Sequence, residues 1–139
     1  MIVMLTAIFN RSLIRWALAF GWTGLVFALM LTPGLEMPKT FLGDLTDKAA
    51  HFTVFAIFFA LWYFALERTL PAGRALWLAL AVTLVLGTAT EVLQGVVPGR
   101  RVSAFDLVAN WAGALGSTAM IRAWLSLRLT ARRTATPEA

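Results

Sequence analysis

Four apolar stretches, each about as long as a helix that crosses a bilayer, run through the chain and are separated by short polar segments. A spanning helix needs about 20 mostly apolar residues, and we expect such helices at about 13–32, 47–66, 75–97 and 106–127. Proline and glycine, which interrupt helices, occur between them at 33–34, 71–73 and 98–99. The sequence therefore predicts an all-α fold, a polytopic membrane protein built as a bundle of four transmembrane helices.

The composition agrees with this interpretation and excludes several classes of protein. Of the 139 residues, 60% are hydrophobic and only 14% are charged, whereas a soluble domain is about 45–50% apolar. Such a chain is neither disordered nor a two-domain enzyme. The absence of cysteine excludes disulfides and thiolate chemistry. We expect one membrane domain over residues 1–139, with a basic cytoplasmic tail at 128–139.

A cleaved signal peptide is the alternative interpretation of the first apolar stretch, because Arg11 and Arg15 precede it. The run from 16 to 31 is long for a signal peptide and no small-residue cleavage site follows it, so a retained helix is favoured. Residues 1–9 are too few to cross a membrane alone. They would lie at the interface or extend the first helix.

The distribution of Lys and Arg predicts the orientation in the membrane, because cytoplasmic loops carry the excess of these residues. With four spans, the side that holds both termini has eight Lys and Arg and the other side has four, together the 12 of the chain. Both termini are therefore expected in the cytoplasm. The net charge of +5 is then a topology signal, and nucleic acid is not an expected partner, since the Arg-rich tail has no interleaved aromatic residues.

Polar residues interrupt the last three stretches at what would be their outer ends. They are Asp47, Lys48 and His51 in the second stretch, Glu91 and Gln94 in the third, and Asp106 and Asn110 in the fourth. Spacings of three and four place the polar residues of each helix on one face. Glu91 would lie roughly 9 Å inside the outer end of its helix, at a rise of ~1.5 Å per residue. It has no helix end to cap, and an ionisable residue at such a depth is a candidate functional residue.

Helix capping is a structural alternative for some of these residues. Ser103 and Asp106 have the spacing of a capping box at the start of the fourth helix. Asp44 and Asp47 could cap the second helix in the same way. For Asp47 and Asp106, capping and ligand binding both remain open.

Packing is the alternative for others. His51 taken alone is more often an interfacial or core histidine than a reactive one. Gln94 and Asn110 could form hydrogen bonds between helices. Gly113 and Gly116 are typical of close helix packing rather than of a phosphate-binding loop.

The order of these motifs resembles the VanZ-like family of small bacterial integral membrane proteins. The resemblance covers about residues 47–116 and rests on Asp47-Lys48-x-x-His51, Glu91-x-x-Gln94 and Pro98-Gly99-Arg100-x-x-Ser103-x-x-Asp106-x-x-x-Asn110-x-x-Gly113. It implies a protein of the bacterial cytoplasmic (inner) membrane with its polar residues at the outer face. It also implies a cell-envelope role linked to antibiotic resistance through reduced susceptibility to teicoplanin. It implies no particular reaction.

Binding of a lipid headgroup or of a lipid-anchored cell-envelope ligand is the function that we expect first. Arg100 would contact phosphate or carboxylate, and Lys48 would add a second positive charge. Hydroxyls and amines of the ligand would bond to Glu91, Gln94 and Asn110. The candidate ligand-binding residues are Asp47, Lys48, His51, Glu91, Gln94, Arg100, Ser103, Asp106 and Asn110.

A membrane-embedded hydrolase or transferase acting on a lipid-linked substrate is the alternative. Glu91 and His51 would be its acid–base groups and Asp47 would orient His51, while water would serve as the nucleophile. A metal site is a further alternative, because oxygen and nitrogen ligands are available from Asp47, His51, Glu91 and Asp106. A single histidine argues against a catalytic zinc site, however, and no cofactor or metal is expected. A third interpretation is a structural bundle that forms homo-oligomers through Gly113 and Gly116.

Overall fold

The protein is described by a computed structural model that covers residues 2–33, 40–100 and 102–135, with side chains described from 11 to 131 within these ranges. Four helices make up the fold: α1 (Ile2–Leu31), α2 (Phe41–Leu66), α3 (Ala72–Gln94) and α4 (Ala104–Ala135). The described residues contain no strand. The predicted all-α fold is therefore confirmed.

The helix boundaries differ from the predicted ones where a local signal was misjudged. α2 begins six residues early because Thr40 caps it: its extended backbone has φ −126° and ψ 159°, and its side chain accepts the N–H of Gly43 at 3.0 Å. The expected cap by Asp44 and Asp47 is therefore wrong. α3 ends at Gln94 instead of residue 97, and a turn follows in which Gly99 has φ 82°, a value that favours glycine.

The first and last helices, α1 and α4, are longer than predicted. α1 begins at Ile2, so the extension of the first helix through residues 1–9 is confirmed from residue 2 onward. α4 continues to Ala135, so most of the segment predicted as a tail is helical, and residues 136–139 lie outside the described residues. At a rise of 1.5 Å per residue, the 32 residues of α4 measure about 48 Å, more than the ~30 Å of a hydrocarbon core.

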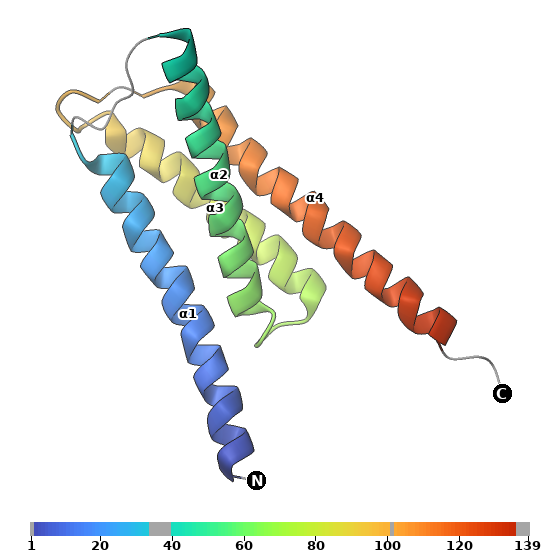
Figure 1. Cartoon of the computed structure of the whole chain (residues 1–139). Helices are drawn as coiled ribbons and strands as arrows, with labels where there is room; N and C mark the ends of the chain where they lie inside the picture. The colour runs from blue at the N-terminus through green and yellow to red at the C-terminus, as the bar shows by residue number, and fades with distance from the viewer. Residues whose placement is uncertain (1, 34–39, 101, 136–139) are drawn as a thin grey trace.

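Successive helices run in alternating directions, and α2 contacts all three of the others (Figure 1). α1 and α3 end, and α2 and α4 begin, at one end of the bundle, which we call the cluster end. The connection between α2 and α3 lies at the opposite end, together with the start of α1 and the end of α4. The polar residues predicted from the sequence all lie toward the cluster end.

Aromatic side chains of α2 fill the centre of the bundle. Phe55, Phe58, Phe59 and Tyr63 are each fully buried, and Phe55 stacks on Phe58 with ring centroids 5.8 Å apart. α4 approaches α2 closely at Gly113, where any added methyl group would collide with the carbonyl oxygen of Phe52. A glycine is therefore required at this crossing.

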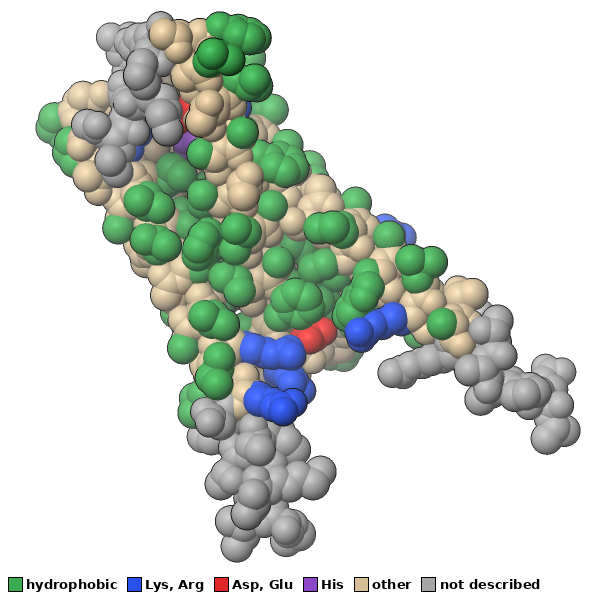
Figure 2. Space-filling view, viewed as in Figure 1, with side chains coloured by type: hydrophobic (Ala, Val, Ile, Leu, Met, Phe, Trp, Pro, Cys, Tyr) green, Lys and Arg blue, Asp and Glu red, His purple; other side chains and the backbone are tan. Residues whose placement is uncertain are grey.

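Many large apolar side chains remain on the outside of the bundle, and Figure 2 shows them spread over one face. Three helical segments are long and apolar enough to cross a membrane, Arg11–Leu31, Phe41–Leu66 and Ala72–Gln94. Such exposed apolar surface on long helices fits a multi-pass membrane protein. The fourth predicted span is not among the three, since polar residues such as Asp106, Asn110 and Arg122 lower the mean hydropathy of α4.

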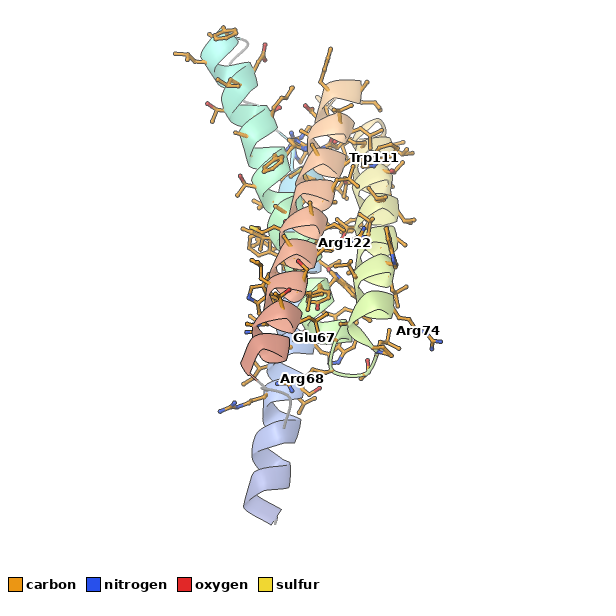
Figure 3. The ribbon with its side chains drawn as sticks, turned by 90° about the vertical axis from the view of Figure 1, so that its right-hand side faces the viewer. Glu67, Arg68, Arg74, Trp111 and Arg122 are labelled. Atoms are coloured by element: carbon orange, nitrogen blue, oxygen red, sulfur yellow. The ribbon has the colours of Figure 1, made fainter. Side chains whose placement is uncertain are left out.

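Charged residues mark the end opposite the cluster. Glu67, Arg68 and Arg74 lie where α2 leads into α3, and the side chain of Arg74 points away from the helices (Figure 3). Arg15 of α1 pairs with Glu67 at 2.8 Å and also donates to the carbonyl of Phe64 at 3.0 Å. This ion pair ties α1 to the end of α2.

Candidate functional site

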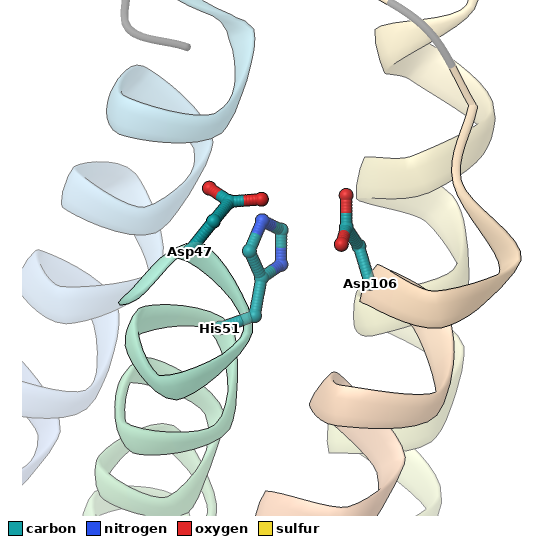
Figure 4. A group of neighbouring side chains, drawn as sticks. All are labelled: Asp47, His51 and Asp106. Atoms are coloured by element: carbon teal, nitrogen blue, oxygen red, sulfur yellow. The ribbon is translucent and has the colours of Figure 1, made fainter. Parts of the chain in front are cut away.

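Three helices bring seven of the predicted residues together at the cluster end. α2 contributes Asp47, Lys48 and His51, α3 contributes Glu91, and Ser103, Asp106 and Asn110 come from α4 and the residue before it. We call these seven residues the polar cluster. Figure 4 shows Asp47 and His51 on α2 facing Asp106 on α4. Asp47 and His51 share one face of α2, and Asp106 and Asn110 share one face of α4, as the spacing of four residues predicts.

The inner part of the polar cluster is a hydrogen-bonded group of three buried side chains. His51, Glu91 and Asn110 are 4%, 2% and 1% exposed. Asn110 Nδ2 donates to Glu91 Oε1 at 3.3 Å, and Asn110 Oδ1 lies 2.8 Å from His51 Nδ1. Since a carboxylate accepts hydrogen bonds, the amide NH₂ faces Glu91 and its oxygen faces His51, so His51 Nδ1 is the donor of that bond. Asn110 thus sets the orientation of the imidazole.

Glu91 also reaches the start of α4. Its Oε2 accepts the backbone N–H of Ser103 at 3.4 Å, and its Oε1 lies 3.7 Å from His51 Nδ1. Each carboxylate oxygen therefore has at least one polar neighbour, as burial of a carboxylate requires. Because α3 ends at Gln94, Glu91 lies about 4.5 Å from the helix end rather than the roughly 9 Å expected.

The outer part of the polar cluster is partly open and centres on Lys48. Its Nζ forms an ion pair with Asp106 Oδ1 at 2.6 Å and lies 3.4 Å from Asp47 Oδ2. The side chains of Lys48, Asp47 and Asp106 are 34%, 28% and 12% exposed. One ammonium group therefore bridges two carboxylates, in a place that a ligand at the end of the bundle can reach.

Ser103 has the predicted capping role. Its Oγ accepts the N–H of Asp106 at 3.3 Å, which stabilises the first turn of α4. The reciprocal bond of a capping box is absent from these residues, since the N–H of Ser103 goes to Glu91. The carboxylate of Asp106 therefore pairs with Lys48 instead of accepting the N–H of Ser103.

Two predicted binding residues are engaged elsewhere. Gln94, 2% exposed, donates from Nε2 to the carbonyl of Met30 at 3.0 Å. Arg100 donates from Nε to Thr32 O at 3.2 Å and from Nη2 to Leu29 O at 3.1 Å. These carbonyls belong to the last turn of α1 and the residue after it, so both side chains hold the end of α1 rather than facing the polar cluster.

The observed partner of His51 also differs from the one predicted for acid–base chemistry. Asp47 was expected to orient His51, but the imidazole is hydrogen-bonded to Asn110, and no hydrogen bond or ion pair joins Asp47 to His51.

The two glycines predicted to pair with a second copy both contact Phe52 of the same chain. Gly113 lies against the backbone of Phe52, and a methyl group added at Gly116 would lie 3.6 Å from its ring. Pairing of two copies through these glycines stays a prediction.

A groove on the outside of α3 and α4 was not predicted from the sequence. Leu84, Val85, Thr88 and Trp111 line a space of about 340 Å³, and Trp111 Nε1 donates to Thr88 Oγ1 at 3.3 Å. Figure 3 shows Trp111 toward the cluster end of α4. The signal available in the sequence was Trp111, which directly follows the polar Asn110 within an apolar stretch.

No family model, no curated protein and no solved structure matches this chain. The resemblance to the VanZ-like family therefore stays a prediction from the motifs. The structure itself shows an all-helical chain with three helices apolar enough to cross a membrane and a polar cluster at one end.

Proposed function

We propose that this chain is a VanZ-like protein of the bacterial cytoplasmic membrane whose polar cluster binds a lipid headgroup or a lipid-anchored cell-envelope ligand. The observation that supports this most is the partly exposed group of Lys48, Asp47 and Asp106 at the end of an apolar bundle. In a membrane, this end of the helices lies at headgroup depth. The excess of Lys and Arg at the other end supports an outer-face position for the polar cluster.

The charges of the outer part suit a ligand with both acceptor and donor groups. Lys48 offers ammonium protons to a phosphate or carboxylate, and Asp47 and Asp106 accept from an amine or a hydroxyl. The inner part of the polar cluster fixes His51 next to these residues, because Asn110 is hydrogen-bonded to both His51 and Glu91. Lys48 replaces Arg100 as the proposed phosphate contact, since the guanidinium already donates to two carbonyls of α1.

The apolar part of a lipid would lie against the outside of the helices. The groove lined by Leu84, Val85, Thr88 and Trp111 begins within about two turns of Glu91 along α3 and has an apolar wall. A groove of about 340 Å³ is large enough for part of an acyl chain. Polar headgroup contacts and apolar chain contacts are therefore available toward the same end of the bundle.

Thermal unfolding of the purified chain in detergent, with added phosphatidylethanolamine or phosphatidylglycerol, tests the binding. A lipid at 100 times its Kd stabilises the folded protein by about 2.7 kcal/mol, which raises Tm by several degrees. We expect Lys48→Met and Asp47→Asn to abolish the increase. Asp44→Asn, on the same helix but exposed and outside the polar cluster, is the matched control and should keep it. If no lipid raises Tm, or if the three variants respond alike, headgroup binding by the polar cluster is wrong.

Susceptibility to teicoplanin and vancomycin tests the envelope role. A sensitive bacterium that expresses the chain should become less susceptible to teicoplanin and remain susceptible to vancomycin, because teicoplanin carries a lipid tail. Lys48→Met at an equal membrane level should remove the protection, whereas Asp44→Asn should retain it. Equal susceptibility with and without the wild-type chain would contradict a resistance role and leave lipid binding to the unfolding experiment.

A further inference from the structure

Three side chains of the polar cluster face one another with donor atoms of the kinds that bind divalent metal ions. A carboxylate oxygen of Asp47, a ring nitrogen of His51 and a carboxylate oxygen of Asp106 all lie within 4.8 Å of one another. No hydrogen bond or ion pair joins His51 to either aspartate. Figure 4 shows the three groups converging on a common space between α2 and α4. The three donor groups therefore lie close together without bonding to one another, and Lys48 pairs with the two aspartates.

The state of His51 supplies the second, independent observation. The residue is 4% exposed, and its Nδ1 is the donor to Asn110 Oδ1. Its Nε2 has no hydrogen-bond partner among the described residues, and the ring edge that carries it is turned toward Asp47 in Figure 4. In neutral histidine, a proton held on Nδ1 leaves the lone pair on Nε2, which is the arrangement of histidines that bind metals. A buried imidazole is thus held with its free nitrogen turned toward the carboxylate of Asp47, and Asp106 faces the same ring from α4.

We infer that Asp47, His51 and Asp106 form a binding site for one divalent transition metal ion of the Zn²⁺ or Mn²⁺ class. Two oxygen donors and one imidazole are typical of such ions, and three protein ligands leave coordination positions for water or a ligand oxygen. Ligand atoms at ~2.1 Å from a tetrahedral ion lie ~3.4 Å apart, so these three atoms, now within 4.8 Å of one another, would approach by up to about 1.4 Å on binding.

Lys48 is the competitor for the ion. Its Nζ lies 2.6 Å from Asp106 Oδ1 and 3.4 Å from Asp47 Oδ2, so the ammonium supplies the positive charge in the absence of a metal ion. A metal ion binds only by displacing this ammonium from Asp106. Lys48 therefore lowers the affinity for the ion, and its removal should raise it. A further carboxylate, Glu91, faces the same imidazole from α3 and lies 3.7 Å from the Nδ1 side, away from the proposed ligand atom.

The test is metal binding by the purified full-length chain in detergent, treated with a chelator and then titrated with ZnCl₂ or MnCl₂ without added lipid. Calorimetry and the loss of the free Mn²⁺ paramagnetic resonance signal both report binding. We expect one ion per chain. Asp106→Asn and His51→Leu should weaken binding at least tenfold. Asn110→Leu, which keeps all three ligands but releases the imidazole, should weaken it about 10–100-fold.

Two further variants distinguish loss of a metal ligand from loss of folding. Lys48→Met should bind the ion at least tenfold more tightly than wild type, an increase that misfolding cannot produce. Asp44→Asn is the matched carboxylate control and should bind as wild type does. Absence of stoichiometric binding by wild type, or equal affinity in wild type, Lys48→Met and Asp106→Asn, overturns the inference.

The inference does not rest on the proposed function. Lipid-induced stabilisation without metal binding overturns only the metal site. Metal binding without any lipid response overturns only headgroup binding.

Discussion

At the scale of single residues, one end of the chain uses similar polar side chains for two different tasks. Arg100 and Gln94 donate to backbone carbonyls at the end of α1, at distances of 3.0–3.2 Å. Lys48 instead pairs with carboxylates and remains partly exposed. The last carbonyls of a helix lack intrahelical partners, and in an apolar environment they need donors from elsewhere. Arg100 and Gln94 therefore stabilise the fold, and Lys48 stays available for a ligand.

Replacement of Arg100 tests whether this residue stabilises the end of α1. Arg100→Met leaves the carbonyls of Leu29 and Thr32 without their charged donor, and we expect a loss of about 1–3 kcal/mol in the free energy of unfolding. Unfolding in detergent measures this loss. Arg74→Met, at an exposed position whose side chain points away from the bundle, is the matched control and should change stability little (Figure 3). Equal stability of the two variants would show that Arg100 does not hold α1.

At the scale of helices, the close contact of α2 with α4 decides which polar residues meet. Gly113 lets α4 approach the backbone of Phe52, one residue after His51. Asn110, one turn before Gly113, then reaches the imidazole at 2.8 Å. The contact combines small-residue packing with a buried hydrogen bond, as is typical of helices in membranes.

A methyl group at position 113 should force these helices apart. In Gly113→Ala the new Cβ would collide with the carbonyl oxygen of Phe52, so backbone must move, and we expect a loss of about 1–3 kcal/mol. Gly116→Ala places its Cβ 3.6 Å from the Phe52 ring, an ordinary contact, and should be neutral or stabilising by up to about 1 kcal/mol through helix propensity. Unfolding of both variants in detergent measures the difference, and a tolerated Gly113→Ala would disprove the tight crossing.

At the scale of the whole molecule, the course of α4 decides the number of membrane crossings. Three helices are apolar enough to cross a membrane, while α4 runs alongside α2 to the opposite end (Figure 1). α4 buries its polar residues against α2 and α3, so a partly polar helix can cross in their company. We expect four crossings, with the end of α4 on the same side as the α2–α3 connection.

Single-cysteine labelling measures this directly, because the chain has no cysteine of its own. Thr69, Val102 and Leu129 are exposed and are suitable for replacement by cysteine. A membrane-impermeant maleimide applied to intact cells should label Val102→Cys, and should label Thr69→Cys and Leu129→Cys only after the membrane is opened. Labelling of Leu129→Cys together with Val102→Cys in intact cells would show three crossings.

Much of this protein is determined locally in its sequence. Apolar stretches of about 20 residues, interrupted by proline and glycine, predict the helices, and a spacing of three or four places Asp47 and His51 on one face. The cap at Ser103 follows from hydrogen bonding within one turn. The start of α2 was predicted wrongly because Thr40, rather than either of the aspartates that follow it, is the N-cap.

Only the tertiary structure decided which polar groups are partners. Arg100 binds carbonyls 68 and 71 residues away, and Asn110 rather than Asp47 orients His51. Such bonds depend on the crossing and relative rotation of packed helices, which local spacing does not specify. The sequence by itself therefore determined the helices and which residues share a face. Packing decided that Lys48 pairs with Asp47 and Asp106 at the cluster end while Arg100 and Gln94 hold the end of α1.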